Sequence, residues 1–161
     1  MRSPTRMIIH AFVVLAVAAG SARAETPFDR AAARGRDEAG GVSSLARRGD
    51  AHAETVLGFM YATGRGVPQN FERAVDWYRR AAEQGDPTAQ YLLGLMYDKG
   101  QGVRQDWVLA HKWLILAAGK ARGREREYYA RIRDAVAFKL SSEQISEAQS
   151  LAAQWRPTRE R

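Results

Sequence analysis

Between residues 51 and 122, the pattern of apolar, small and polar residues repeats with a period of 36 positions. In the first copy Leu57-Gly58 precedes Tyr61, and in the second copy Leu93-Gly94 precedes Tyr97 at the same spacing. The other matched pairs are Gly49 and Gly85, Asp50 and Asp86, Ala53 and Ala89, Gly64 and Gly100, Gly66 and Gly102, Val67 and Val103, Asn70 and Asp106, Ala74 and Ala110, Trp77 and Trp113, and Ala81-Ala82 and Ala117-Ala118. A period of this length is typical of arrays in which each repeat buries its apolar face against its neighbours.

Each copy predicts two antiparallel helices. Ala53, Leu57 and Tyr61 recur at intervals of four residues, which places them on one face of the first helix. In the second helix, Trp77 has alanines three residues before it and four residues after it. Small alanines let helix axes approach closely, whereas large aromatic rings fill the space between neighbouring repeats. We therefore expect Trp77 and Trp113 to lie in the core.

Capping residues mark where these helices begin and end. Asp86-Pro87 combines an N-cap carboxylate with a proline at the first helical position, where its missing N–H costs nothing. Asn70 and Asp106 are expected to cap the second helices. Gly64 and Gly100 follow the last periodic residue of the first helices, where a left-handed conformation favours glycine.

The segment before the repeats, residues 25–50, is predicted to be an N-terminal cap or a degenerate half-repeat. Residues 46–50 imitate residues 82–86, the end of the first repeat. Gly40-Gly41 is expected to interrupt a helix in this segment.

Residues 123–161 are predicted to form C-terminal capping helices, because an array of two repeats leaves open apolar ends. Ser141 and Gln144 form a capping box that starts the last helix. Residues with helical spacing before and after that box are Tyr128, Ile132, Val136 and Leu140, then Ile145, Ala148, Ala152 and Trp155.

Residues 1–24 have the pattern of a cleavable signal peptide. Arg2 and Arg6 precede an uncharged apolar run over residues 7–19, and Ala22-Arg23-Ala24 presents small residues at the positions a signal peptidase reads. The run is too short for a bilayer core, which needs about 20 apolar residues. We therefore expect cleavage after Ala24 and a periplasmic or secreted mature protein.

Composition narrows the function classes. The 161 residues are 45% hydrophobic and 27% charged, as in an ordinary globular protein, and there is no cysteine for disulfides, thiolate metal sites or thiol catalysis. The net charge of +7 falls to +4 when residues 1–24 are removed with their three arginines and no acid. This modest charge, without a polybasic run, argues against nucleic acid as a partner.

The matched residues resemble the Sel-one-like repeat, a relative of the tetratricopeptide repeat. That pattern is an alanine, then Leu-Gly-x-x-Tyr, Gly-x-Gly-Val, Asp or Asn, an alanine, an aromatic residue, and Ala-Ala before glycine. Residues 51–86 and 87–122 satisfy nearly all of it, although Ala121 stands where the first copy has Gly85. The resemblance implies an all-α, right-handed solenoid of antiparallel helix pairs with helical caps, acting through protein–protein contacts.

Arrays of this kind use the first helices of successive repeats to line a concave groove. In the Leu-Gly-x-x-Tyr register, the groove positions are His52, Thr55, Phe59, Ala62, Thr63, Thr88, Tyr91, Leu95, Asp98 and Lys99. Phe59, Tyr91 and Leu95 are apolar where the repeat pattern does not demand it, which suits a bound peptide. The alternative is that Phe59 and Leu95 simply pack against the next helix pair.

Candidate catalytic residues are few, and we expect a non-enzyme without metal or cofactor. His52 and His111 are interpreted as solvent-facing, since a zinc site needs further ligands. Exported relatives of this repeat have been linked with penicillin binding and β-lactam hydrolysis, but no Ser-x-x-Lys or Lys-Thr-Gly is present in the mature sequence. The Gly-x-Gly pairs lack the remaining features of a phosphate-binding loop and are interpreted as turns.

The sequence therefore predicts a non-catalytic adaptor or regulator that binds another protein of the cell envelope. A binder of the cell wall or of polyanions, through weak contact with anionic cell-wall polymers, is the first alternative, and a hydrolase of cell-wall material or β-lactams is the second. The oligomeric state is left open.

Overall fold

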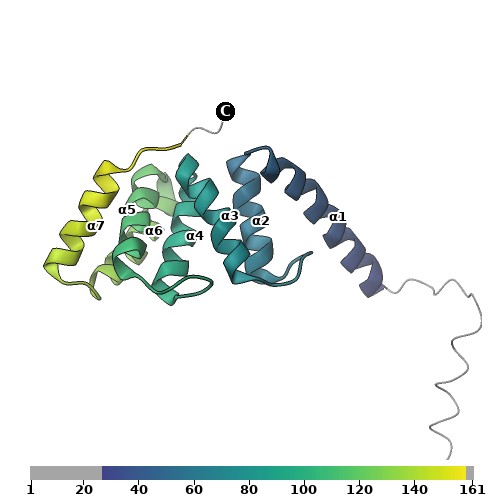
Figure 1. Ribbon diagram of the computed structural model, residues 1–161, viewed down its shortest axis with the longest axis horizontal. Coiled ribbons are helices and arrows are strands. Elements are labelled where there is room, and N and C mark those ends of the chain that lie inside the picture. Colours follow the sequence, from purple (N-terminus) through teal and green to yellow (C-terminus); the bar gives the residue numbers. More distant parts are fainter. Residues whose placement is uncertain (1–26, 159–161) are drawn as a thin grey trace, which may run out of the picture. The chain divides into compact units, whose positions relative to one another are not determined.

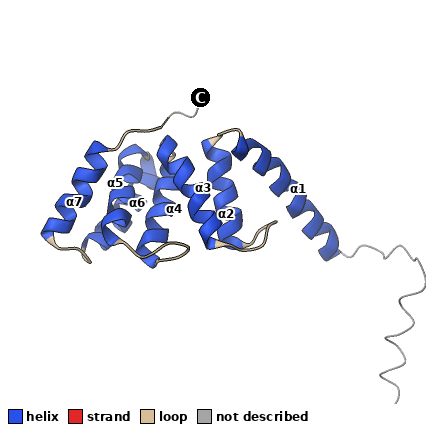
Figure 2. Ribbon diagram, in the orientation of Figure 1, coloured by secondary structure: helices blue, strands red, loops and turns tan. Residues whose placement is uncertain are grey.

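A computed structural model describes the backbone of residues 27–158. Its regular structure over this range is entirely α-helical: α1 Pro27–Arg47, α2 Ala51–Thr63, α3 Phe71–Gln84, α4 Pro87–Lys99, α5 Trp107–Lys120, α6 Gly123–Ala137 and α7 Ser142–Gln154 (Figures 1 and 2). The expected leader, residues 1–24, lies outside the described residues. Of the helices described, none is both long enough and apolar enough to cross a membrane. The chain divides into two compact units, residues 1–30 and residues 31–161, and the second unit contains both repeats.

The C-terminal helices continue the repeat register. The first helices begin at Ala51, Pro87 and Gly123, so α6 starts 36 residues after α4, as α4 does after α2. The expected capping helices α6 and α7 are thus a third helix pair. Their connection, residues 138–141, is shorter than the loop over residues 64–70 because it lacks the Gly-x-Gly-Val sequence.

Packing between successive helices confirms an all-α solenoid. α2 packs on α3, α3 on α4, and α4 on α5, as expected for an array in which each element contacts its sequence neighbours. At the C-terminal end, α6 and α7 both pack on α5, and more extensively than they pack on each other. α5 is therefore the helix that joins the second repeat to the third pair.

The glycine of the Leu-Gly motif sets how closely the two helices of a repeat approach. A Cβ atom at Gly58 would lie 2.6 Å from Cδ1 of Tyr78, and one at Gly94 would lie 2.9 Å from Cγ of Leu114. The same two Cβ positions are 3.2 Å from the carbonyl oxygens of residues 74 and 110. Only glycine fits this contact, which explains why the motif recurs in both copies.

The predicted caps are confirmed. The side chains of Asn70, Asp86 and Asp106 each accept a hydrogen bond from the backbone N–H three residues later, at 2.7–2.9 Å. Ser141 and Gln144 form the expected capping box at the start of α7. Gly64 and Gly100 have φ of 72° and 65°, the left-handed conformation that ends α2 and α4.

The expected helix break at Gly40-Gly41 is wrong, because α1 continues through both residues. A glycine inside a helix costs only about 1 kcal/mol relative to alanine, and packing offsets this cost. Ala39 and Ala46 of α1 are buried in one cluster with Leu57 of α2.

The two tryptophans expected in the core differ. Trp113 is buried, whereas Trp77 is only half-buried, and the wholly buried aromatic side chain of α3 is Tyr78. Trp155 packs on Trp113 edge to face, with 6.3 Å between ring centroids.

We expect Gly58→Ala to lower the free energy of unfolding by about 1–3 kcal/mol, because the added methyl group overpacks the contact with Tyr78. Gly119→Ala is the matched control, since Gly119 also lies in a helix but has open space around its Cβ position. That variant should be neutral or more stable by up to about 1 kcal/mol. Chemical denaturation measures both, and equal stability of the two variants would contradict the close contact.

Candidate functional site

The predicted groove is exposed mainly on α2. His52, Phe59 and Thr63 lie at intervals of seven and four residues, so they follow one line along the helix, which we call the α2 stripe. Phe59 is 47% exposed, a high value for a large apolar side chain. The Thr63 hydroxyl donates a hydrogen bond to the Phe59 carbonyl oxygen at 2.8 Å.

Two other predicted groove positions on α2 do not contribute such a surface. Thr55 is only 5% exposed, and its hydroxyl donates to the Ala51 carbonyl oxygen at 2.9 Å. Its place on the groove surface is therefore wrong: the internal hydrogen bond satisfies the hydroxyl and allows it to be buried without an unpaired polar group. Ala62 is half-buried and packs against the core around α3 and α4.

On α4, the predicted groove residue Tyr91 is covered by α6 of the third helix pair. The ring of Tyr91 stacks on Tyr129 of α6 with centroids 4.5 Å apart and an interplanar angle of 13°. Its hydroxyl lies 3.1 Å from the hydroxyl of Tyr128, which is also on α6. Burial raises the pKa of Tyr91 above its ordinary value. Tyr91 is thus a packing residue between helix pairs rather than a free anchor for a partner.

The other predicted groove residues on α4 differ in their exposure to solvent. Asp98 pairs with Lys139, which follows α6, at 2.6 Å between Oδ1 and Nζ. Thr88 and Leu95 are half-buried, and Lys99 is exposed. Of the predicted groove residues, those of the α2 stripe and Lys99 at the end of α4 therefore remain exposed to solvent.

A buried ionic cluster connects α2 to α3. The wholly buried carboxylate of Glu54 lies 2.9 Å from an Nη atom of Arg80 and accepts a hydrogen bond from Nε2 of Gln84 at 2.7 Å. The position 36 residues after Glu54 holds Gln90, which is also wholly buried and donates to the Ala82 carbonyl oxygen at 3.1 Å. A buried polar group at this position in both repeats indicates a structural role: Glu54 joins the two helices of the first repeat, and Gln90 joins α4 to α3 of the preceding pair.

His111 departs from the expectation that it faces solvent, whereas His52 fulfils it. His111 is 4% exposed, and no hydrogen-bonding group of the described chain reaches its Nδ1 atom. Burial lowers the pKa of His111 below its ordinary value, although a hydrogen bond to the backbone of Arg133 opposes this shift. Burial therefore favours the neutral form of this side chain.

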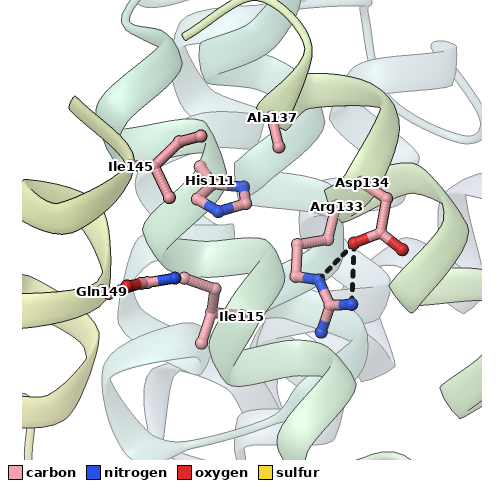
Figure 3. A pocket seen from close by; sticks show the side chains of 7 residues that line it. All are labelled: His111, Ile115, Arg133, Asp134, Ala137, Ile145 and Gln149. Atoms are coloured by element: carbon pink, nitrogen blue, oxygen red, sulfur yellow. Dashed lines mark hydrogen bonds and ion pairs between the residues drawn. The ribbon is translucent and has the colours of Figure 1, made fainter. Parts of the chain in front are cut away.

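His111 lines a pocket of about 340 Å³ between α5, α6 and α7, which we call the His111 pocket. Its other lining residues are Ile115 of α5, Arg133, Asp134 and Ala137 of α6, and Ile145 and Gln149 of α7 (Figure 3). One feature of the sequence points to this pocket: a histidine stands where the first repeat has Val75, a buried core residue.

Among the described residues, no group of three or more histidine or acidic side chains is arranged to hold a metal ion. The glycine pairs lie in the loops after α2 and α4, as the turn interpretation predicted.

The packing and register above define a helical-repeat solenoid. The Sel1 repeat family matches residues 51–86 and 87–120, so the chain contains two Sel1 repeats. Sel1 repeats generally mediate protein–protein interactions.

Two solved structures are similar. One is a protective antigen present in uropathogenic Escherichia coli strains and displaying an SLR fold, with 30% sequence identity, a TM-score of 0.70, and coverage of 74% of this chain and 25% of that chain. The other is a Sel1 repeat protein from Oxalobacter formigenes, with 26% sequence identity and a TM-score of 0.55. The match covers 77% of this chain and 53% of that chain. This chain thus spans a quarter and about half of their lengths. None of the curated proteins matches it significantly.

The different surroundings of Phe59 and Tyr91 predict losses of stability of different size when each is replaced by alanine. Tyr91→Ala removes the stacking on Tyr129 and should lower the free energy of unfolding by about 2–4 kcal/mol. Phe59→Ala should lower it by less than about 1 kcal/mol, because the side chain is half exposed. Thermal melts compare the two variants. If Phe59→Ala melts as low as Tyr91→Ala, Phe59 belongs to the core and the α2 stripe is not a free surface.

Proposed function

We propose that this protein is a non-catalytic interaction module of the bacterial cell envelope and that it binds a segment of another protein on the α2 stripe. The observation that carries this proposal is the exposure of Phe59. Aromatic side chains of this kind are frequent anchors in protein interfaces, where a few residues supply most of the binding energy. The general role of Sel1 repeats in protein–protein contacts supports the same function.

The covering of α4 by α6 limits what the surface can bind. Because Tyr91 is stacked on Tyr129 and Asp98 is paired with Lys139, a partner has access to α2 and to the exposed end of α4. This surface suits a short peptide or one helix better than a long extended chain that follows several repeats. We therefore propose a partner segment anchored by apolar side chains around Phe59.

We expect Phe59→Ala to weaken partner binding tenfold or more, equivalent to at least about 1.4 kcal/mol. The assay is crosslinking of the mature protein in envelope extract, followed by an affinity measurement with the partner recovered. Phe138→Ala is the matched control, since Phe138 is also a phenylalanine and is 92% exposed, but it lies in the connection after α6 and not on α2.

Three results would contradict this function. Equal loss of binding in Phe59→Ala and Phe138→Ala would show that the α2 stripe is not the site. Binding that collapses between low and physiological salt would favour the alternative of a polyanion or cell-wall binder, because an apolar contact persists in salt. Turnover of nitrocefin by the purified protein would favour the hydrolase alternative.

Location in the envelope is a separate part of the proposal and rests on the leader pattern over residues 1–24. In a bacterial host that exports the full chain, we expect the mature protein to begin at Glu25, because Ala22 and Ala24 are the small residues before the cleavage position. N-terminal sequencing of the exported form measures this. A chain that still begins near Met1 would contradict export by a cleaved signal.

A further inference from the structure

The half-buried ring of Trp77 lines a pocket of about 270 Å³, which we call the Trp77 pocket. Its other lining residues are Tyr61 of α2 and Arg73, Asp76 and Arg80 of α3. Residues 73, 77 and 80 are separated by four and three positions, so they lie on one face of α3. The pocket therefore combines two aromatic rings with three charged side chains.

The two arginines lie against the aromatic rings. The guanidinium carbon of Arg80 is 5.0 Å from the centroid of the Trp77 ring, and that of Arg73 is 5.5 Å from the centroid of the Tyr61 ring. Arg73 also donates from Nη1 to the Tyr61 hydroxyl at 3.2 Å. A guanidinium carries several N–H donors in a planar fork, so this contact orients Arg73 and leaves it donors for a ligand.

The charges of the Trp77 pocket favour an anion. Arg80 is paired with the buried carboxylate of Glu54 at 2.9 Å, and Asp76 is paired with Arg79 at 3.3 Å. Each of these pairs is neutral overall. Within the described residues, Arg73 contacts a phenol ring rather than a carboxylate, so it supplies one positive charge beyond the two pairs. A carboxylate is attracted to this charge, whereas an ammonium group is repelled by it.

The second repeat closes the equivalent position with apolar side chains. Leu109 and Leu116 stand 36 residues after Arg73 and Arg80, and Leu116 packs against the core cluster that contains the buried Trp113. The repeat can therefore fold without arginine at either position. In the first repeat, the ion pair with α2 accounts for Arg80 but not for Arg73. An exposed arginine beside an accessible tryptophan ring is more consistent with a binding surface.

We propose that the Trp77 pocket binds an acidic side chain of another protein together with an adjacent aromatic side chain. The carboxylate would pair with Arg73, whose fork can form two parallel N–H···O bonds, and the aromatic side chain would lie on the Trp77 ring. A volume of about 270 Å³ is below the usual range for drug-sized ligands and suits one or two side chains. Tryptophan and arginine are also the residue types that most often supply binding energy in protein interfaces.

This pocket is separate from the α2 stripe. Tyr61 is two residues after Phe59, which places the two side chains on different sides of α2. The other residues of the Trp77 pocket belong to α3. The proposal for this pocket therefore does not depend on a partner at the α2 stripe.

The test is a titration of the mature protein at low ionic strength with two N-acetylated, C-amidated dipeptides, Glu-Phe and Gln-Phe, which have nearly the same shape and differ in charge. The NMR signals of the tryptophan indole N–H groups report binding. We expect Glu-Phe to shift the Trp77 signal with a Kd at least about fivefold lower than that of Gln-Phe. Equal Kd values, an unchanged Trp77 signal, or shifts confined to Trp113 and Trp155 would overturn the proposal.

Inorganic phosphate distinguishes a peptide site from a general anion site. We expect phosphate to leave the Trp77 signal nearly unchanged at concentrations where Glu-Phe shifts it, because phosphate has no group to lie on the indole ring. A phosphate Kd equal to that of Glu-Phe would overturn the assignment of a peptide.

A variant of Arg73 identifies the group that recognises the charge. In Arg73→Gln, the two dipeptides should bind within about twofold of each other, because the cation that pairs with the carboxylate is removed. Arg104→Gln is the matched control: Arg104 is also an exposed arginine, but it lies in the loop before α5, so the fivefold difference should remain. Both replaced side chains are exposed, and both variants should keep their thermal stability. Retained discrimination in Arg73→Gln would contradict the assignment.

A charge change of the opposite sign provides a second check. Asp76→Asn removes the carboxylate that lines the pocket and should lower the Kd of Glu-Phe by about twofold or more, because less negative charge then opposes the ligand. The Kd of Gln-Phe should stay the same. Weaker binding of Glu-Phe in Asp76→Asn would overturn the proposal, because it would show that Asp76 holds the ligand instead of repelling it.

Discussion

The close approach of two helices at one glycine is the contact on which the structure of each repeat depends. Gly58 allows the ring of Tyr78 to lie against the α2 backbone, and Gly94 does the same for Leu114 against α4. Because the second helix is held so close, its other face is available to the next pair, and successive pairs can stack. The capping residues fix where each helix begins, but this contact fixes how the helices lie together.

The third helix pair makes the two ends of the array different. At the C-terminal end, α6 and α7 pack on α5, and Tyr129 covers Tyr91, so the apolar surface expected on α4 is used for folding. At the N-terminal end, α1 packs against α2 but leaves Phe59 half exposed. The arrangement therefore concentrates the open apolar surface on α2 and creates a pocket beside α5. Both features follow from how the array is terminated.

Much of the fold was predictable from the sequence because the repeated residues act locally. Capping carboxylates, left-handed glycines and four-residue apolar spacing each report on a single helix or turn. The third pair was recognised only as capping helices because it lacks the Gly-x-Gly-Val loop, and its register depends on packing against α5. The covering of Tyr91 and the burial of His111 were missed for the same reason, since both depend on residues about 20 to 40 positions away in the chain. Thr55 was misplaced because spacing alone does not show that its hydroxyl is satisfied inside the helix.

Amide hydrogen exchange in Gly94→Ala tests most directly whether the close helix contact supports the rest of the array. A Cβ at this position would lie 2.9 Å from Cγ of Leu114, so α5 must shift away from α4. We expect protection to fall in α4 and α5 and also in α6 and α7, which pack on α5 or cover α4, and to fall less in α2 and α3. Loss of protection confined to α4, with α5 to α7 unchanged, would contradict it.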